Sequence, residues 1–324
     1  MSGKYTVIST FAGGGGSSLG YHLAGFKEVL AIEWDKNACE TLRLNFPDLL
    51  VWEKDITKVT GKEILKELNI KKGELDIFDG SPPCQGFSMM GKRKVNDPRN
   101  ELFLAYCNLL KELQPKVLMM ENVSGMMKGK MKGMFKVILQ ELENSGYNVK
   151  CKLMNAKYYN VPQSRERLIF IGVRKDIDIE VCFPEIKYKI ITVKEAIKDF
   201  ENENFETNSN ASMMNMMLKV KQGRTAADVM NGSFFGSVRL HYNKPAATVR
   251  KTFRKGWNAF YHPKFNRNLS IKELKRICSF PDNYILIGKF EEQWAILGNA
   301  VMPNMMKEIA LNIKSNILDK YYNQ

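Results

Sequence analysis

One cysteine of this 324-residue chain stands in a setting that suits covalent chemistry. Cys84 directly follows Pro82 and Pro83 at the end of an apolar segment, where a Pro-Pro turn would hold a thiol rigidly. The thiolate is the nucleophile, and a free thiol with a pKa of about 8.5 is only slightly ionised at neutral pH. No histidine is near Cys84 in the sequence, so a Cys–His hydrolase dyad is poorly supported.

An acid at the end of the next apolar segment offers a different partner. Glu121 stands there, and a thiol and a carboxyl at adjacent strand ends suit conjugate addition to a pyrimidine. Cytosine C5 is a weak nucleophile until a thiolate adds to C6 and turns the ring into an enamine. An acid that donates to N3 helps this addition.

Two arginines precede a further apolar segment. Gln163, Arg165 and Arg167 alternate, so in an extended chain their side chains share one face. Two guanidinium groups beside the thiol would bind phosphate, hold a base oxygen and favour the thiolate. A structural salt-bridge role is the alternative for this stretch taken alone.

A glycine-rich stretch at residues 11–20 lies between a predicted strand and a predicted helix. Such a loop lets a ligand approach the backbone, and a helix N-terminus favours negative charge. The dinucleotide pattern G-x-G-x-x-G would require glycine at position 18 or 19, where Ser18 and Leu19 stand. No G-K-[ST] follows either, so nicotinamide dinucleotide and Walker-type sites are disfavoured; a simple tight turn is the alternative.

Polar residues also follow the second and third predicted strands. Glu33 suits hydrogen bonding to ribose hydroxyls, Trp34 could cover an adenine ring, and Asp55 could accept from an adenine amino group. Each of them alone is equally a helix cap or a surface charge. As an ordered set at strand ends they predict a cofactor that contains adenosine.

The elements that must position these residues follow a parallel α/β pattern. Short apolar runs alternate with helical stretches in the first half of the chain. The predicted strands cover residues 6–11, 28–33, 75–78, 116–120 and 168–173, and helical spacing marks residues 63–68 and 102–113.

The second half of the chain is less regular. Residues 200–235 are polar and irregular, which predicts a smaller, loop-rich domain. Ser270 and Glu273 have the spacing of a capping box at the start of a short helix. A last helix is predicted over residues 303–321, with Pro303 at its first position.

The net charge of +14 and the pI of about 9.3 favour a polyanionic partner. Six scattered cysteines without a C-x-x-C pair predict reduced thiols and neither a disulfide framework nor a metal site. No stretch approaches the ~20 apolar residues of a membrane span, and no signal peptide is expected. We therefore expect a cytoplasmic protein without a membrane partner.

Taken in order, these stretches resemble the DNA cytosine-C5 methyltransferase family over nearly the whole chain. The family's cofactor loop F-x-G-x-G-G, its P-C-Q, E-N-V, Q-x-R-x-R and G-N-x-V motifs and its D-x-R-x-x-L-F stretch are all matched. The matching residues are Phe11, Gly13, Gly15 and Gly16; Pro83, Cys84 and Gln85; Glu121, Asn122 and Val123; Gln163, Arg165 and Arg167; Gly298, Asn299 and Val301; and Asp97, Arg99, Leu102 and Phe103.

The resemblance implies an S-adenosylmethionine-dependent fold with a doubly wound, Rossmann-like sheet and a smaller, irregular target-recognition domain. It places the catalytic domain at residues 1–190 plus 290–324 and the target-recognition domain at 191–289. The implied cofactor-binding residues are Phe11, Gly13, Gly15, Gly16, Glu33, Trp34, Asp55, Ile56, Pro83, Leu102, Asn299 and Val301.

The resemblance also implies the catalytic roles. Cys84 would attack C6 of a cytosine flipped out of duplex DNA, and Glu121 would contact N3 and the exocyclic amine. Arg165 and Arg167 would hold the flipped base and its backbone. The candidate DNA-contacting residues, some in a loop at 86–100 that would close over DNA, are Gln85, Ser88, Lys92, Arg93, Gln163, Arg250, Lys251 and Arg254.

This sequence departs from the family pattern in two places. The cofactor loop has four consecutive glycines, and the region at about 190–290 matches only near its end. The absence of a regulatory extension favours a bacterial or phage enzyme, expected to be monomeric, with a cognate restriction endonuclease as a possible partner.

Two alternatives stay open at this point. A branch of the family methylates tRNA, but its Cys-Phe-Thr tripeptide is missing here. The second alternative is a catalytically inactive DNA-binding relative, against which the intact Cys84, Glu121 and Q-x-R-x-R argue. A zinc deaminase is disfavoured because its C-x-x-C and H-x-E are absent.

Overall fold

A computed structural model describes residues 5–83, 101–127, 132–186, 188–203, 205–229 and 236–324. Contacts group the chain into two compact units, which are described separately. Unit 1 comprises residues 1–154, 166–185 and 306–324, and unit 2 comprises residues 155–165 and 186–305. The predicted domains divide the chain at 190 and 290 instead, and those bounds stay a prediction.

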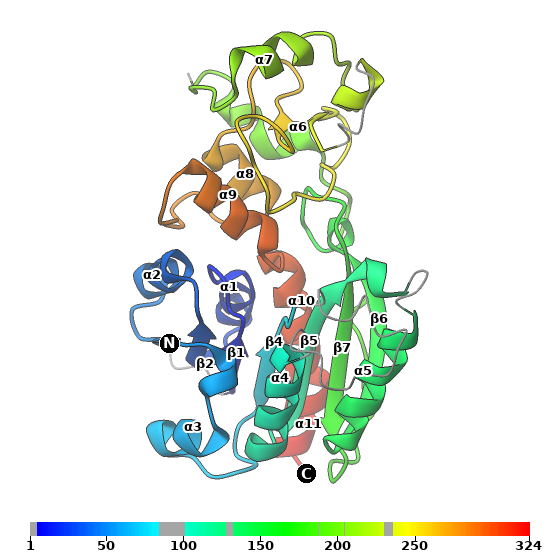
Figure 1. Ribbon diagram of the computed structural model, residues 1–324. Coiled ribbons are helices and arrows are strands. Elements are labelled where there is room, and N and C mark those ends of the chain that lie inside the picture. The colour runs from blue at the N-terminus through cyan, green and yellow to red at the C-terminus, as the bar shows by residue number, and fades with distance from the viewer. Residues whose placement is uncertain (1–4, 84–100, 128–131, 187, 204, 230–235) are drawn as a thin grey trace. The chain divides into compact units, whose positions relative to one another are not determined.

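Unit 1 is built on a seven-stranded sheet, as counted over the described residues. Its order is β3-β2-β1-β4-β5-β7-β6 (Figure 1). The strands are β1 (Thr6–Thr10), β2 (Lys27–Glu33), β3 (Leu50–Glu53), β4 (Ile77–Gly80), β5 (Val117–Val123), β6 (Tyr147–Asn155) and β7 (Glu166–Arg174).

The first five strands run parallel, and β7 pairs antiparallel to β5. Parallel strands place their carboxyl ends at one edge of a sheet, where open α/β folds bind their ligands. The strand order changes direction at β1, since β2 lies on one side of it and β4 on the other. The predicted doubly wound α/β fold is therefore confirmed.

Helices cover the sheet because its central strands are apolar on both faces. The helices of unit 1 are α1 (Gly16–Leu23), α2 (Lys36–Asn45), α3 (Gly61–Leu68), α4 (Glu101–Leu113), α5 (Lys132–Asn144), α10 (Pro303–Ile313) and α11 (Asp319–Tyr322). Buried residues of α3, α4 and α5 form one core with Ile8, Leu30 and Phe78 of the sheet. In Figure 1, α10 and α11 lie on the other side of that sheet. The predicted last helix is present, interrupted by a π-helical turn at Lys314–Leu318.

A buried polar cluster at the amino ends of the strands fixes the C-terminal helix. Asp76, just before β4, accepts hydrogen bonds from the Tyr322 hydroxyl (2.6 Å) and the Thr6 amide (2.8 Å). Its carboxylate also lies 3.2 Å from Lys116 Nζ, and both charged side chains are buried. The charges are therefore paired, which a buried ion pair requires. This cluster holds the edge of the sheet opposite to the strand ends that carry the predicted site.

Unit 2 contains few regular elements, as the sequence predicts. Its longer segments are α6 (Val193–Ile197), α7 (Ala211–Met217), α8 (Ile271–Ile277) and α9 (Phe290–Asn299), with a short pair of strands, β8 (Val238–Arg239) and β9 (Phe260–Tyr261). The predicted capping box is confirmed, because the Ser270 hydroxyl accepts from the Glu273 amide and the Glu273 carboxylate accepts from the Ser270 amide. Among the described residues no helix has the length and hydropathy to cross a membrane.

A buried arginine joins the loops of unit 2. Arg239 donates to the carbonyl oxygens of Val220 (2.9 Å), His262 (2.9 Å) and Phe265 (3.2 Å) and to the side chain of Asn266 (2.9 Å). These acceptors belong to several separate segments. One guanidinium group therefore satisfies carbonyl groups that irregular loops would otherwise leave unpaired.

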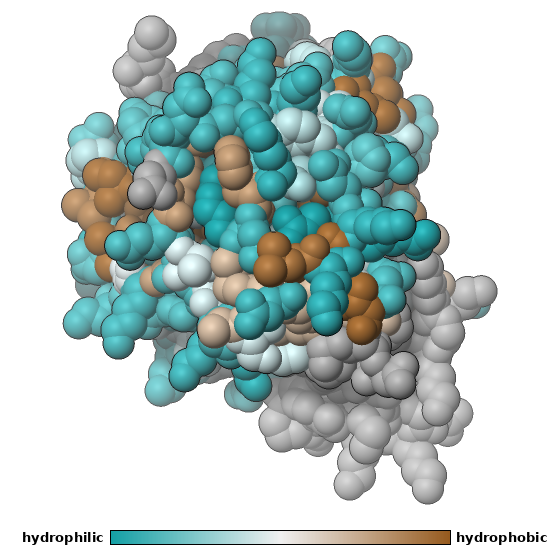
Figure 2. Space-filling view, turned by 90° about the horizontal axis from the view of Figure 1, so that it is seen from above, coloured by the Kyte–Doolittle hydropathy of each residue, from teal (hydrophilic) through white to brown (hydrophobic). Residues whose placement is uncertain are grey.

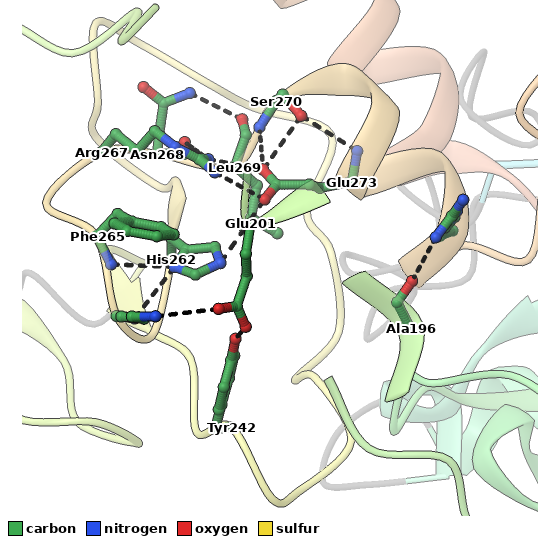
Figure 3. A network of polar contacts seen from close by, with 12 residues as sticks. Ala196, Glu201, Tyr242, His262, Phe265, Arg267, Asn268, Leu269, Ser270 and Glu273 are labelled. Atoms are coloured by element: carbon green, nitrogen blue, oxygen red, sulfur yellow. Dashed lines mark hydrogen bonds and ion pairs between the residues drawn. The ribbon is translucent and has the colours of Figure 1, made fainter. Parts of the chain in front are cut away.

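A second buried network surrounds Glu273 (Figure 3). Arg267 binds this carboxylate with both terminal nitrogens, at 2.7 and 2.9 Å. The fully buried His262 accepts the amides of Lys264 (3.1 Å) and Phe265 (3.0 Å) at Nδ1. Since Nδ1 acts as an acceptor, these bonds assign the ring proton to Nε2, which lies 3.7 Å from Glu273. Burial lowers the pKa of His262 to about 4.

We expect unit 2 to lose stability at acid pH through His262. An unfolded histidine takes up its proton near a pKa of about 6.5, so stability is lost as pH falls from there towards 4. A His262→Asn variant, whose amide oxygen can replace the Nδ1 acceptor, should show a shallower pH dependence of the unfolding free energy, by up to about 1.4 kcal/mol per pH unit. Urea unfolding between pH 4 and 7 measures this. The control His22→Asn, at an exposed position, should keep the wild-type slope; a wild-type slope in His262→Asn would contradict the assignment.

Candidate active site

The glycine-rich loop leaves β1 through left-handed backbone conformations. Phe11, Gly13 and Gly15 have φ values of 53°, 54° and 84°, and Gly16 begins α1. Such conformations favour glycine, and Phe11 is a non-glycine exception whose ring packs against the core. A Cβ atom on Gly13 would meet nothing within 4 Å, so the space beside the loop is open to a ligand.

Glu33 at the end of β2 ties this loop to the neighbouring strand. Its carboxylate accepts the amides of Gly13 (2.7 Å), Trp34 (2.8 Å) and Asp35 (2.9 Å). Charge-assisted bonds of this kind are about twice as strong as neutral ones. The structure therefore brings Glu33 and the glycine loop together, as their placement at adjacent strand ends predicts. Trp34 beside them is 78% exposed, so its ring face is free to cover a ligand.

Asp55 follows β3 and caps a short 3-10 helix, η1 (Ile56–Lys58). It accepts from the amide (3.0 Å) and hydroxyl (2.9 Å) of Thr57, and the amide bond is the largest cause of its lowered pKa. Ile56 is buried in the core, and Leu102 of α4 packs against the same core. The cofactor roles predicted for these three residues stay predictions.

We expect Glu33→Ala to weaken S-adenosylmethionine binding by at least about tenfold, because the Gly13 amide of the loop and the amides of Trp34 and Asp35 after β2 lose a charged acceptor. Isothermal titration calorimetry measures the change. Glu53→Ala is the matched control, since Glu53 pairs with Glu33 in the register of β3 and β2 but faces Arg43. Equal affinities of the two variants would contradict the role of Glu33.

The turn after β4 begins at a glycine with no space for a side chain. A Cβ atom on Gly80 would lie 2.5 Å from Thr10 Oγ1 and 2.6 Å from the Tyr106 ring. Asn122 of β5 then donates to the carbonyl of Pro82 at 3.1 Å, and its own oxygen accepts the Val123 amide at 2.8 Å. The polypeptide is therefore held from two neighbouring strands just before Cys84.

Cys84 itself lies outside the described residues, as do Gln85, Ser88, Lys92 and Arg93. Pro83, the last described residue of the turn, is exposed. Burial raises the pKa of four other cysteines, Cys39, Cys107, Cys151 and Cys278, to about 12. These four thiols are therefore poor nucleophiles at neutral pH.

Glu121 and Arg167 form the charged pair of the site. Arg167 Nε lies 2.6 Å from Glu121 Oε1, and both side chains are about nine-tenths buried. The antiparallel register of β5 and β7 sets this contact, because it places Val123 opposite Arg167 and Glu121 opposite Ile169. The structure thus brings together Glu121, the acid predicted to contact the cytosine, and Arg167, the cation predicted to hold that base.

Gln163 and Arg165 belong to unit 2. Gln163 is fully buried in unit 2, where its oxygen accepts the Val249 amide at 3.1 Å. Arg165, 2% exposed, donates to the carbonyls of Val249 (3.0 Å) and Gly298 (2.9 Å). Of the three residues only Arg167 lies within β7, and the expectation that their side chains share one face stays a prediction. These three hydrogen bonds of Gln163 and Arg165 go to backbone atoms of unit 2. Their roles in binding DNA and the flipped base stay predictions.

Other predicted residues also belong to unit 2. Asn299, at the end of α9, is exposed and Val301 is buried; their cofactor role stays a prediction. Sequence reasoning did not assign a role to Asn122, although it stands beside Glu121 in a matched motif. Its place in that motif, just after a predicted strand, was the available signal.

Replacing the Asn122 amide by a carboxylate tests the support of the turn. Asn122→Asp keeps an acceptor for the Val123 amide but loses the donor to Pro82. We expect kcat to fall on the order of tenfold, from the loss of one buried hydrogen bond and the repulsion between two oxygens. The affinity for S-adenosylmethionine should hardly change. Single-turnover methylation measures the chemical step, and calorimetry measures the affinity for S-adenosylmethionine. Equal losses in rate and affinity would contradict a role of Asn122 that is confined to the turn.

Comparison with known proteins agrees with this geometry. The family model for C-5 cytosine-specific DNA methylases matches residues 5–315. The chain belongs to this family. It is 37% identical to the Type II methyltransferase M1.HphI of Haemophilus parahaemolyticus, over 94% of this chain and 85% of that protein. It is 33% identical to M.FnuDI of Fusobacterium nucleatum, over 97% and 95%.

A solved structure shows the same fold. It is a candidate DNA modification methyltransferase encoded within a prophage of E. coli, with a TM-score of 0.80 at 23% identity. The alignment covers 97% of this chain and all of that one. The chain is an S-adenosylmethionine-dependent DNA cytosine methyltransferase, and the predicted family, fold, enzyme class and cofactor are confirmed.

Proposed function

We propose that this methyltransferase modifies C5 of a flipped cytosine in one short sequence of duplex DNA, with Cys84 as its covalent nucleophile. The observation that carries the proposal is the Glu121–Arg167 ion pair, in which Glu121 belongs to β5, the strand next to β4, and Arg167 belongs to β7. Bound S-adenosylmethionine supplies the methyl group to C5.

The residues of the chain account for the remaining steps. The Cys84 sulfur forms a bond to C6, while Glu121 faces N3 and the exocyclic amine and Arg167 holds Glu121 in place. After C5 is methylated, removal of the C5 proton returns the electron pair to the ring, and the C6–S bond breaks. The C5 proton passes to water, so the products are 5-methylcytosine, S-adenosylhomocysteine, one released proton and the free Cys84 thiolate.

Unit 2 supports the proposal with an exposed basic turn. Arg250, Lys251 and Arg254 are exposed, and Arg254 pairs with Trp257 across a tight turn. Gly256, with a φ of 98°, packs so closely that a Cβ atom would lie 2.6 Å from the hydroxyls of Ser209 and Tyr261. A rigid basic turn suits contacts to the DNA backbone.

The protein surface and the names of similar proteins indicate where and on what this enzyme acts. Hydrophilic side chains cover most of the face drawn in Figure 2, which suits a hydrated polyanion. The similar proteins come from bacteria and are named Type II methyltransferases. We infer a bacterial or phage-infected cell as the setting and propose that the enzyme is a cytoplasmic monomer. A cognate restriction endonuclease would cut the same sequence when it is unmethylated.

Duplex DNA that contains 5-fluorocytosine tests the covalent step, because fluorine at C5 blocks elimination. With S-adenosylmethionine present, we expect the wild type to form an adduct stable to denaturation and Cys84→Ser to form none. Cys151→Ser is the control and should form the adduct as the wild type does. An adduct that persists in Cys84→Ser, or methyl transfer to tRNA but not to duplex DNA, would contradict the proposal.

A further inference from the structure

A short basic segment of unit 2, residues 249–255, combines anchored and exposed side chains. Val249 and Phe253 are buried, at 1% and 5% exposed, and Gly256 directly after the segment is buried as well. The exposed side chains are four cations, Arg250, Lys251, Arg254 and Lys255. The segment therefore presents its positive charges to solvent while its apolar side chains anchor it in unit 2.

These four cations differ from other basic side chains of unit 2 in their partners. Lys264 lies 3.0 Å from a carboxylate oxygen of Glu201. Lys272 lies 2.9 Å from one of Glu203. Within the part of the chain that the structure describes, no ion pair involves a cation of the basic segment. Cations without an acidic partner are available to neutralise phosphates, and each neutralised phosphate releases bound counterions.

Helix α9 holds the backbone of the basic segment. Trp294 Nε1 donates to the Arg250 carbonyl at 2.9 Å, and the indole is fully buried. The centroid of its ring also lies 5.1 Å from that of Phe253. About one turn later, a Cβ atom on Gly298 would lie 2.6 Å from the Arg250 carbonyl oxygen and 2.7 Å from Lys251 Cα. A side chain at position 298 would therefore push the segment away from α9.

Two residues of the Q-x-R-x-R motif hold the start of the basic segment. The side-chain oxygen of Gln163 accepts the Val249 amide at 3.1 Å, and Arg165 donates to the Val249 carbonyl at 3.0 Å. The other terminal nitrogen of Arg165 donates to the Gly298 carbonyl at 2.9 Å. One buried guanidinium group thus joins the start of the segment to the end of α9. The rigid fork of an arginine suits such a bridge, whereas a lysine ammonium is a single point charge.

We propose that Trp294 and Arg165 are positioning residues that hold the basic segment in the conformation that binds the phosphates of duplex DNA. Both side chains are at most 2% exposed, so they act through the backbone of residues 249–251 and do not touch DNA. For Arg165 this role replaces the base contact that the family resemblance implies. A segment that is ordered before binding loses less conformational freedom on DNA. The proposal rests on the proposed action on duplex DNA.

The first measurement tests whether the basic segment contacts phosphates. The affinity for a fluorescein-labelled duplex of random sequence is measured by anisotropy from about 50 to 200 mM potassium chloride, where the slope of log Kd against log salt is about 0.9 per neutralised phosphate. The double variant Arg254→Gln, Lys255→Gln should lower this slope by about 1 to 2 and weaken binding at least about tenfold. Lys264→Gln with Lys272→Gln is the matched control, because it also removes two cations of unit 2 and should keep the wild-type slope.

The second measurement tests positioning with variants that keep the net charge. Trp294→Phe keeps an aromatic ring but loses the donor to Arg250, and Arg165→Lys keeps the charge but loses the bridge. We expect each to raise Kd about fivefold and to lower the salt slope by about 1, because a looser segment binds fewer phosphates together. The rate of methyl transfer at saturating plasmid DNA should change less than about twofold. Tyr242→Phe is the control, since it also removes a polar group from an aromatic side chain, whose partner is Glu201.

Three outcomes would overturn the proposal. A wild-type slope in Arg254→Gln, Lys255→Gln would show that the segment does not contact phosphates. A wild-type affinity and slope in either charge-conserving variant would remove that residue from the account. A loss of the saturated rate in Arg165→Lys without a loss of DNA affinity would show that Arg165 contacts the reacting base. Thermal unfolding confirms that each variant is folded, and Trp294→Phe keeps the test decisive if Arg165→Lys does not fold. Binding of random DNA does not require Cys84, so failure of adduct trapping is distinguishable from failure of this proposal.

Discussion

The carboxyl ends of parallel strands at one edge of the sheet are the constraint on which the rest of this enzyme depends. The order β3-β2-β1-β4-β5 places Glu33, the glycine loop, the Pro-Pro turn and Glu121 along that edge. Each position is then fixed locally: three amides hold Glu33, the Asn122 amide holds Pro82, and Arg167 holds Glu121. At the other edge, Asp76 joins Lys116 and Tyr322, so the chain's last helix stabilises the same sheet.

Local patterns made much of unit 1 predictable. Alternating apolar and helical segments gave β1, β2, β4, β5, α3 and α4 within a few residues, since periodicity reflects burial directly. The cofactor loop was recognisable because left-handed backbone at Gly13 and Gly15 requires glycine. The capping box at Ser270 was recognisable because its donors and acceptors are three residues apart.

The features that the sequence did not reveal depend on distant partners. Arg165 is indistinguishable from Arg167 by spacing, yet its partners are carbonyls of Val249 and Gly298, far along the chain. Every residue type offers a backbone carbonyl, so a side chain that donates to the backbone does not restrict which residue stands at the partner position. The bond from Asn122 to Pro82 was hidden for the same reason.

Charged side chains have different roles in different parts of the molecule. The excess of positive charge suits a polyanionic substrate, while the site uses few, individually supported acids. Unit 2 uses buried cations differently, since Arg239 and Arg267 satisfy carbonyls and Glu273 where regular structure is scarce.

The central claim is that this chain forms 5-methylcytosine in duplex DNA. The most direct measurement is incubation of purified enzyme with unmethylated plasmid DNA and S-adenosylmethionine that carries a deuterated methyl group, followed by digestion to nucleosides and mass spectrometry. The account predicts deuterated 5-methylcytosine as the product, and bisulfite sequencing should place it in one recurring sequence. Label in N4-methylcytosine or N6-methyladenine, or no label in DNA while tRNA is labelled, would contradict it.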